Sequence, residues 1–150
     1  MIQIYVDADA CPVKAEVYRV ALRFGVKVFV AVNNPLQVPA NDLIELVVKT
    51  GFGGVDDWIA ETCGPGDVVV TADIPLAAQA LQRGAIVLDH RGRAFTENDI
   101  GEALATRELM SHLRAGGEAT GGPAPFTPKD RSRFLSKLDE TLHKVRRLMS

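Results

Sequence analysis

The sequence predicts an α/β protein: a three-layer α/β/α sandwich built on a mostly parallel β-sheet. Short apolar segments alternate with amphipathic helical segments through residues 1–95. Several apolar segments are nearly continuous, as expected of strands covered on both faces. The 150 residues, 47% hydrophobic and 24% charged, have the size and composition of one globular domain. We therefore predict a single domain, with an α/β core at residues 1–95 and a helical C-terminal extension at 96–150.

The first half of the core supplies two predicted strands and a helix. In residues 2–7 apolar and polar side chains alternate, which predicts a strand that ends in the carboxylate of Asp7. Pro12 suits the first turn of a helix, and Gly25 is a helix-stop signal. Residues 26–32 form the second predicted strand. The apolar face of the intervening helix consists of Val13, Val17, Val20, Ala21 and Phe24.

The second half of the core repeats this alternation. The predicted elements are a strand at 43–48, a glycine loop at 51–54, a helix from Asp56 to about Cys63, a strand at 68–71, a helix at 75–83 and a strand at 85–88. Strand–helix–strand crossovers bring the carboxyl ends of parallel strands to one edge of a sheet, where functional groups gather. The carboxylates predicted at such ends are Asp7, Asp73 and Asp89.

The C-terminal extension is predicted to be helical. Thr96 and Asp99 have the spacing of a capping box before a helix at 97–115. A Gly/Pro-rich connection follows at 116–128, and Thr127 or Asp130 is positioned to cap a last helix. We expect that helix to pack on the domain through an apolar stripe of Phe134, Leu135, Leu138, Leu142, Val145 and Met149.

Composition excludes several classes of protein. No apolar run approaches the length of a membrane-spanning helix, and the N-terminus lacks the basic region of a signal peptide. The two cysteines make neither a disulfide framework nor a zinc site, so the reducing cytoplasm is the expected compartment. The net charge of -2 hides an asymmetry: residues 1–100 are acidic and residues 101–150 are basic. Such a division suits an acidic catalytic centre beside a basic binding surface, or two differently solvated faces.

Carboxylates dominate the candidate functional residues. Asp7 and Asp9 flank one small residue directly after a buried strand. Carboxylates held together repel one another unless a cation neutralises them, and Mg²⁺ prefers such hard oxygen ligands. The alternative is that Asp9 caps a helix and Asp7 stabilises a turn. Asp73 follows a second strand, where it too is able to cap a helix, and Thr71 is able to orient a ligand or water.

A further acidic pair, Asp56 and Asp57, follows the loop at 51–54. The glycines of this loop permit close approach, so Asp56 is expected to point into the cluster, whereas Asp57 suits a solvated first helical turn. We therefore predict a site for Mg²⁺ or Mn²⁺ formed by Asp7, Asp9, Asp56 and Asp73.

Basic residues near the same edge are candidate phosphate ligands. Arg91 and Arg93 are able to clamp phosphates, and Lys14 is a further contact or an ordinary surface lysine. We expect His90 to be structural or solvated. Cys11 is expected to be a packed residue rather than a nucleophile, because nearby carboxylates oppose thiolate formation and no base is paired with it.

Five motifs occur together along nearly the whole chain: Val6-Asp7-Ala8-Asp9-Ala10-Cys11-Pro12, Gly51-Phe52, Thr71-Ala72-Asp73-Ile74-Pro75-Leu76-Ala77, Arg91-Gly92 and Thr120-Gly121-Gly122-Pro123. In this combination the sequence resembles the YaiI/YqxD family of uncharacterised bacterial proteins, which is grouped with PIN-like domains. PIN-like proteins are often Mg²⁺- or Mn²⁺-dependent ribonucleases with several strand-end carboxylates in one acidic pocket.

The resemblance implies roles for particular residues. Asp7 matches the PIN carboxylate after the first strand, Asp73 matches the later one, and Asp56 takes the middle position. Asp9 belongs to the family's own motif. PIN nucleases commonly carry a Glu in the middle of this set, and no Glu stands at the matching place here.

Three functions are compatible with these residues. The first is a divalent-metal-dependent phosphodiesterase, catalysed through Asp7, Asp56 and Asp73, which acts on RNA held by the basic C-terminal third and by Lys14, Thr71, Arg91 and Arg93. The alternative is a non-catalytic RNA- or nucleotide-binding module with the same fold. A haloacid-dehalogenase-like phosphatase, suggested by Asp7 and Asp9, ranks third because Asp56 and Asp57 precede Thr71, the wrong order for that family.

Overall fold

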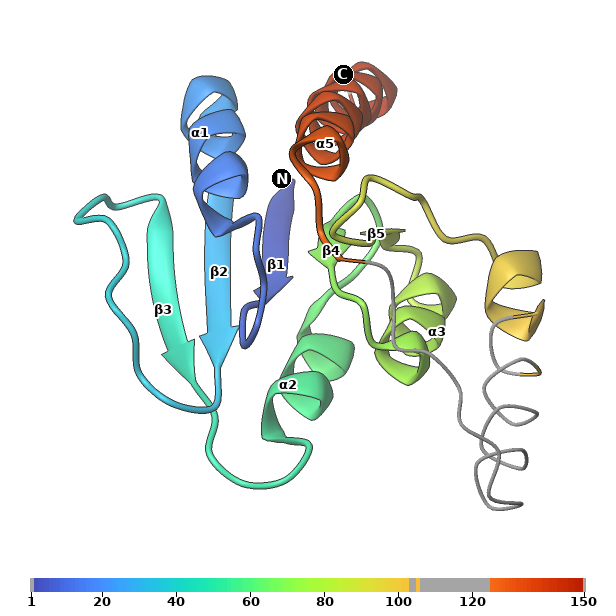
Figure 1. Cartoon of the computed structure of the whole chain (residues 1–150), viewed down its shortest axis with the longest axis horizontal. Helices are drawn as coiled ribbons and strands as arrows, with labels where there is room; N and C mark the ends of the chain where they lie inside the picture. Colours follow the sequence, from blue (N-terminus) through green and yellow to red (C-terminus); the bar gives the residue numbers. More distant parts are fainter. Residues whose placement is uncertain (1, 103–104, 106–124, 150) are drawn as a thin grey trace.

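The computed structural model describes residues 2–102, 105 and 125–149. It contains a five-stranded sheet with the strand order β3-β2-β1-β4-β5, in which all neighbouring strands are parallel. The strands are β1 (Gln3–Asp7), β2 (Lys27–Val32), β3 (Ile44–Val48), β4 (Val68–Val70) and β5 (Ile86–Leu88). The labelled helices are α1 (Lys14–Phe24), α2 (Gly54–Thr62), α3 (Ile74–Gln82) and α5 (Pro128–Met149) (Figure 1). These elements confirm the predicted α/β class and the order of elements in the core.

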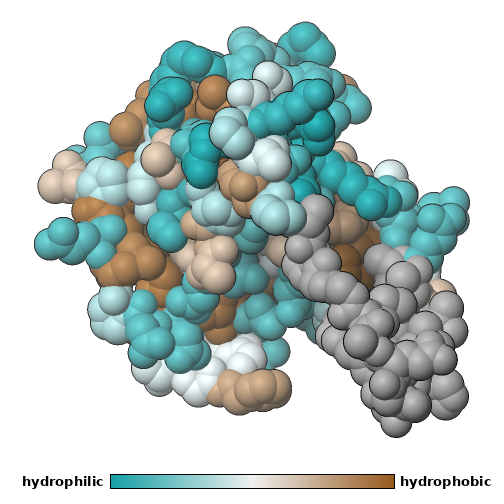
Figure 2. All heavy atoms as spheres, viewed as in Figure 1, coloured by the Kyte–Doolittle hydropathy of each residue, from teal (hydrophilic) through white to brown (hydrophobic). Residues whose placement is uncertain are grey.

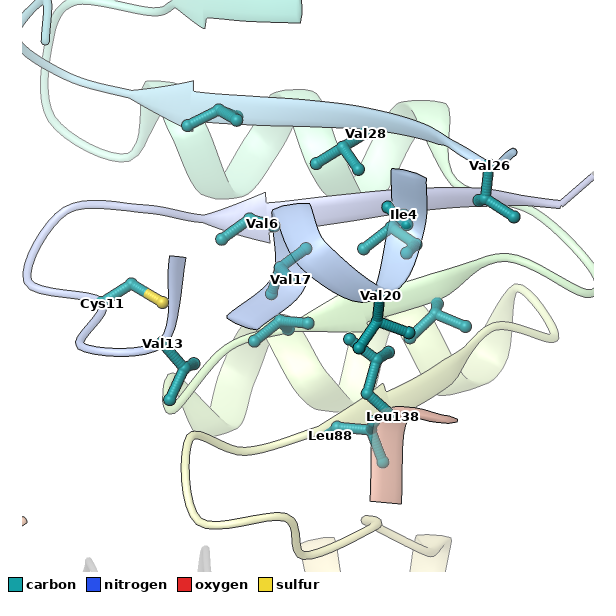
Figure 3. Close-up of a cluster of buried hydrophobic side chains, with 14 of the residues drawn as sticks. Ile4, Val6, Cys11, Val13, Val17, Val20, Val26, Val28, Leu88 and Leu138 are labelled. Atoms are coloured by element: carbon teal, nitrogen blue, oxygen red, sulfur yellow. The ribbon is translucent and has the colours of Figure 1, made fainter. Parts of the chain in front are cut away.

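The helices cover both faces of the sheet because alternate strand residues point to opposite sides. Ile4 and Val6 of β1 face α1 and α5, where side chains from the sheet, α1 and α5 interdigitate (Figure 3). Tyr5 faces the other way, into a second apolar cluster that includes Ile59 of α2 and Leu76 of α3. The molecule is therefore the predicted three-layer sandwich.

The helix α5 completes the first of these layers. It runs parallel to α1, since Arg131 near its start pairs with Glu16 and Arg146 near its end donates to the Phe24 carbonyl oxygen. Three residues of the predicted apolar stripe, Phe134, Leu138 and Leu142, are fully buried. The prediction that this helix packs on the domain is confirmed.

Local signals set most helix ends as predicted. Thr127 and Asp130 cap α5 together: the Asp130 N–H donates to Thr127 Oγ1 (3.1 Å), and the Thr127 N–H donates to Asp130 Oδ2 (3.0 Å). Thr96 and Asp99 form the same reciprocal capping box before the helical residues 97–102. Most of the predicted helix over 97–115, and the connection over 116–124, lie outside the described residues.

Several boundaries differ from the prediction by one or two residues. The helix α1 begins at Lys14, so Pro12 lies before the helix rather than in its first turn. The helix α2 begins at Gly54 rather than Asp56, because Gly53 has a left-handed conformation (φ 75°) that ends the preceding loop two residues earlier. The helix α3 begins at Ile74, one residue early, with Asp73 as its N-cap. In the described part of the chain, no helix has the length and apolarity to cross a membrane.

Candidate functional site

The strand order creates a topological switch point between β1 and β4. From β1 the chain proceeds to β2 on one side, whereas β4 pairs on the other side of β1. The helices that follow these two strands, α1 and α3, pack on opposite faces of the sheet. The connections after β1 and β4 therefore diverge, and in open parallel sheets ligands bind in the crevice formed at such a point.

Asp7 and Thr71 meet at this switch point. Asp7 is the last residue of β1, and Thr71 directly follows β4. The Thr71 hydroxyl donates to Asp7 Oδ2 (2.8 Å) and accepts from the Asp73 backbone N–H (3.0 Å). One buried hydroxyl thus links the carboxylate of Asp7 to the backbone of Asp73, and the two predicted strand-end residues lie together as the parallel topology leads one to expect.

Asp73 has the capping role that the sequence left open. Its Oδ1 accepts from the Leu76 backbone N–H (2.9 Å) at the start of α3. The cap uses only one carboxylate oxygen. Among the hydrogen bonds of the described residues, none reaches Asp73 Oδ2 or Asp7 Oδ1. A capping role and a place in the acidic cluster are therefore compatible for Asp73.

The electrostatics of this edge are dominated by negative charge. The pKa of Asp7 is raised from 3.8 to about 6, first by burial and then by the charges of Asp56, Asp73 and Asp9, against the lowering effect of the Thr71 hydrogen bond. The pKa of Asp56 is also raised, by burial and by the charges of Asp73 and Asp57. None of the ion pairs formed by residues 2–102, 105 and 125–149 involves the predicted metal ligands Asp7, Asp9, Asp56 and Asp73.

Asp9 lies in an exposed loop and does not cap a helix. Its Oδ2 accepts from the Asn33 backbone N–H (2.8 Å), while the Asn33 side-chain amide donates to the carbonyl oxygens of Lys49 (3.2 Å) and Gly51 (2.9 Å). The helix α1 instead has Val13 as an N-cap without a side-chain hydrogen bond. Asp9 therefore connects the loops that follow β1, β2 and β3.

Backbone strain accompanies this loop. Ala10 has a φ of 60°, and it is the only residue other than glycine with positive φ in the described ranges. A side chain in this left-handed region costs about 1–2 kcal/mol. Such strain is concentrated at functional sites in folded proteins.

The four predicted carboxylates do not form a closed metal cage. Within the part of the chain that the structure describes, no three His, Cys, Asp or Glu side chains are close enough to hold a metal ion together. Mg²⁺ is commonly bound through only one or two carboxylates and keeps several waters. In such a site the partly buried Asp7 carboxylate would contact the ion, and the charges of Asp56, Asp73 and Asp9 would add to the negative potential around it.

Comparisons with known proteins agree with the motifs. The family model described as "Uncharacterized BCR, YaiI/YqxD family" matches residues 5–144. The chain belongs to the YaiI/YqxD family. The UPF0178 protein bll3966 of Bradyrhizobium diazoefficiens is 56% identical over 146 residues, covering 97% of this chain and 87% of the relative. A UPF0178 protein of Brucella ovis is 54% identical, covering 96% of this chain and 91% of the relative. No solved structure matches significantly.

The predicted phosphate ligands of this YaiI/YqxD-family protein have other partners. Arg91 pairs with Asp130 (3.0 Å) and Arg93 pairs with Asp99 (3.2 Å), while the Lys14 ammonium donates to the Cys11 carbonyl oxygen (3.1 Å). The two arginines thus fasten the loop after β5 to the C-terminal helical segments. Both arginines keep more than a third of their side-chain surface exposed.

The Asp89 carboxylate stabilises the loop after β5. Its Oδ1 accepts from the backbone N–H groups of Arg91 (2.9 Å) and Arg93 (2.8 Å). Burial lowers the pKa of His90, which keeps its imidazole neutral at pH 7. Burial raises the pKa of the Cys11 thiol, which favours the packed role predicted for that residue.

Sequence analysis missed Asn33 as a residue that supports the site. Its signal was the Asn33-Asn34-Pro35 break after a buried strand, a place where Asn side chains commonly bond to nearby backbone. That pattern indicates a turn, but it does not identify the distant carbonyl groups that the amide contacts.

Proposed function

We propose that the protein is a PIN-like, divalent-cation-dependent phosphodiesterase that cleaves RNA. The observation that carries this proposal is the meeting of Asp7, Thr71 and Asp73 at the switch point, where none of the ion pairs among the described residues reaches the carboxylates. The raised pKa of Asp7, caused by burial and by three other carboxylates, agrees with it. A protein tolerates such uncompensated charge where a bound cation offsets it.

Each residue of the site has a distinct role in this proposal. Mg²⁺ or Mn²⁺, when bound, activates water and neutralises charge on the phosphate. Asp7 and Asp73 supply the negative charge that holds the cation. The Thr71 hydroxyl orients the Asp7 carboxylate through its 2.8 Å hydrogen bond. Asp56, in the first turn of α2, adds charge from the opposite face of the sheet to that of α1.

A groove with a net positive lining supports RNA as the substrate. It has a volume of about 410 Å³ and is lined by the loop at Gly92 and by one face of α5. It contains three cationic side chains and one carboxylate: Lys129, Arg133 and Lys137, with Glu140, which pairs with Lys137. Hydrophilic residues also cover the end of the molecule that holds α1 and α5 in Figure 2. Such a surface suits the phosphate backbone of a nucleic acid, whose binding weakens as salt rises.

The alternative function is non-catalytic binding of RNA or a nucleotide. It is favoured by the lack of three closely placed metal-ligating side chains among the described residues. No observation favours the haloacid-dehalogenase-like phosphatase over these two functions.

Cleavage of a fluorescently labelled single-stranded RNA by the purified protein in Mn²⁺ tests the proposal. We expect cleavage that EDTA abolishes and that Asp7→Asn lowers by about 100-fold or more. The matched control is Asp139→Asn, which removes a carboxylate paired with Arg23 on the opposite side of the molecule from this chemistry. It should leave cleavage within about threefold of wild type. RNA binding without cleavage would favour the alternative, and cleavage by a folded Asp7→Asn protein would refute the proposed site.

A further inference from the structure

Phe52 is an aromatic residue held entirely in solvent. Its relative exposure is 109%, against 76% for Leu148 and 39% for Leu22, the next most exposed large apolar residues that the structure describes. The other aromatic rings near this edge are packed: Tyr5, Phe29 and Trp58 contact one another with centroid separations of 5.2–5.8 Å. Phe52 takes no part in that cluster, so both faces of its ring are open.

The loop that carries Phe52 is anchored at both ends. Gly51 and Gly53 have φ angles of 93° and 75°, which side chains other than glycine rarely adopt. The Asn33 amide donates to the Gly51 carbonyl oxygen (2.9 Å), and the Asp57 backbone N–H donates to the Gly53 carbonyl oxygen (2.9 Å). A bulky group at Gly54 would approach the Lys49 carbonyl oxygen to 3.2 Å. These contacts fix the residues on either side of Phe52, and the ring therefore projects from a defined turn.

The same contacts connect the Phe52 loop to residues of the acidic site. Asn33, which holds the Phe52 loop through its side chain, donates its backbone N–H to Asp9. The loop leads directly into α2, whose first turn carries Asp56. Figure 1 shows this β3–α2 loop extending beyond the carboxyl ends of β2 and β3. Phe52 thus lies at the edge of the sheet where the cation site is proposed.

We infer that Phe52 stacks on an unpaired base of a single-stranded RNA whose phosphate lies at the acidic site, an inference that rests on the proposed function. An open aromatic ring next to a phosphate-handling site is the arrangement by which proteins hold single strands. Every base presents a π-face, so such stacking tolerates any sequence. Bases in a duplex are already stacked on their neighbours, and the site therefore prefers single-stranded over double-stranded RNA.

Binding of oligouridylate in Ca²⁺, followed by fluorescence anisotropy, tests this role with three variants. Stacking on one base accounts for roughly 5- to 150-fold in affinity, so Phe52→Ala should weaken binding by about that factor. Phe52→Leu, apolar but not aromatic, should lose most of the same affinity. Phe52→Trp should bind at least as well as wild type. Leu148→Ala, which truncates another exposed apolar residue on α5, is the matched control and should bind as wild type does.

Indole fluorescence supplies a second readout that distinguishes stacking from general apolar contact. Oligouridylate should quench the emission of Phe52→Trp beyond the change seen in wild type, which contains only the packed Trp58. Inorganic polyphosphate, which has charge but no bases, should not quench it. Equal affinities of wild type, Phe52→Ala and Phe52→Leu would overturn the inference. So would an effect of Phe52→Ala on self-association in sedimentation without an effect on RNA binding.

These outcomes separate the inference from the proposed function. If wild type cleaves RNA and Phe52→Ala binds it equally well, only the stacking role is wrong. If wild type does not cleave but Phe52→Ala loses affinity and Phe52→Trp is quenched, the stacking role holds for the non-catalytic binding module.

Discussion

Carboxylates in two regions of this molecule have opposite electrostatic surroundings. On the side covered by α1 and α5, Glu16 pairs with Arg131, and Asp130 pairs with Arg91 and Arg133. The pKa of Asp130 is lowered, mainly by the hydrogen bond from the Thr127 backbone N–H. At the carboxyl edge of β1 and β4, the pKa of Asp7 is raised to about 6. The comparison teaches that the paired carboxylates Glu16 and Asp130 stabilise the fold. The unpaired carboxylates around Asp7 instead lower the free energy of unfolding.

The backbone shows the same division. In the packed region, Gly92 has a φ of 82°, and a Cβ there would lie 2.7 Å from the Arg133 carbonyl oxygen. In the acidic region, Ala10 has a φ of 60°, a conformation that glycine adopts without strain. Glycine is thus present where packing demands it, and a strained alanine stands in the loop beside the proposed site.

The largest effect is expected from Gly92→Ala. The left-handed backbone and the approach of the Cβ to α5 together should lower the free energy of unfolding by about 2–4 kcal/mol in urea denaturation. Gly25→Ala is the matched control, because Gly25 also has positive φ but has no atom within 4 Å of the added Cβ. It should lose about 1 kcal/mol. Equal losses in the two variants would mean that α5 does not press on the loop after β5.

Arg131→Met tests the ion pairs of the packed region. It leaves the buried Glu16 carboxylate without its partner and removes a hydrogen bond to the Pro12 carbonyl oxygen (2.7 Å). Breaking a buried pair costs about 3–5 kcal/mol, and the partial exposure of Arg131 reduces this to about 1–3 kcal/mol. Lys129→Met, two residues before Arg131 on the same helix, should change the stability by less than about 0.5 kcal/mol. Stability unchanged by Arg131→Met would show that this pair does not hold α5 to α1.

Asp7→Asn should raise the free energy of unfolding at neutral pH, whereas the two preceding substitutions lower it. The native protein, in which the pKa of Asp7 is about 6, binds its proton more tightly than the unfolded chain, in which the pKa is near 3.8. The stability that Asp7 contributes is therefore complete below about pH 4 and is lost as the pH rises through about 6. Without metal, Asp7→Asn should match wild type at pH 4 and exceed it by about 1–2 kcal/mol at pH 7.5, allowing for the partial exposure of the carboxyl group. A destabilised variant at pH 7.5 would indicate that Asp7 serves only as a turn residue.

Ala10→Gly is expected to have the smallest effect. Relief of the left-handed strain is worth about 1–2 kcal/mol and is mostly offset by the greater entropy of glycine in the unfolded chain, so the variant should gain less than about 1 kcal/mol. Thermal denaturation of the metal-free protein measures the gain. A clear loss of stability would show that the Ala10 methyl group makes contacts that outweigh its strain.

Much of the fold could be predicted because its signals are local. Continuous apolar runs such as residues 26–32 identified the buried strands, and glycine or proline marked the ends of most elements. The capping box at Thr96 could be predicted because it depends on residues three positions apart. Thr127 and Asp130 were predicted as alternative caps of the last helix, and the structure shows that they act together. The error at the start of α2 arose because several glycines adjoin there, and the sequence does not say which of them ends the loop.

The site was predictable only in part because its partners are distant in sequence. The topology rule brought Asp7 and Asp73 to one edge, and the structure places both on the Thr71 hydroxyl. No local pattern indicated that Arg91 would pair with Asp130, 39 positions away. Nor did any pattern show that Phe52 would stand in solvent, because exposure depends on how the loops after β2 and β3 fit together.

Binding of Mn²⁺ tests the central claim, that the carboxylates at the switch point are kept to hold a cation. The measurement is the melting temperature of wild type, Asp7→Asn and Asp139→Asn with and without millimolar Mn²⁺. An ion at about 100 times its dissociation constant stabilises a protein by roughly 2.7 kcal/mol, which is a rise of several degrees for a chain of this size. We expect that rise in wild type and in Asp139→Asn, and none in Asp7→Asn. No stabilisation of wild type, or an equal rise in all three proteins, would contradict the claim.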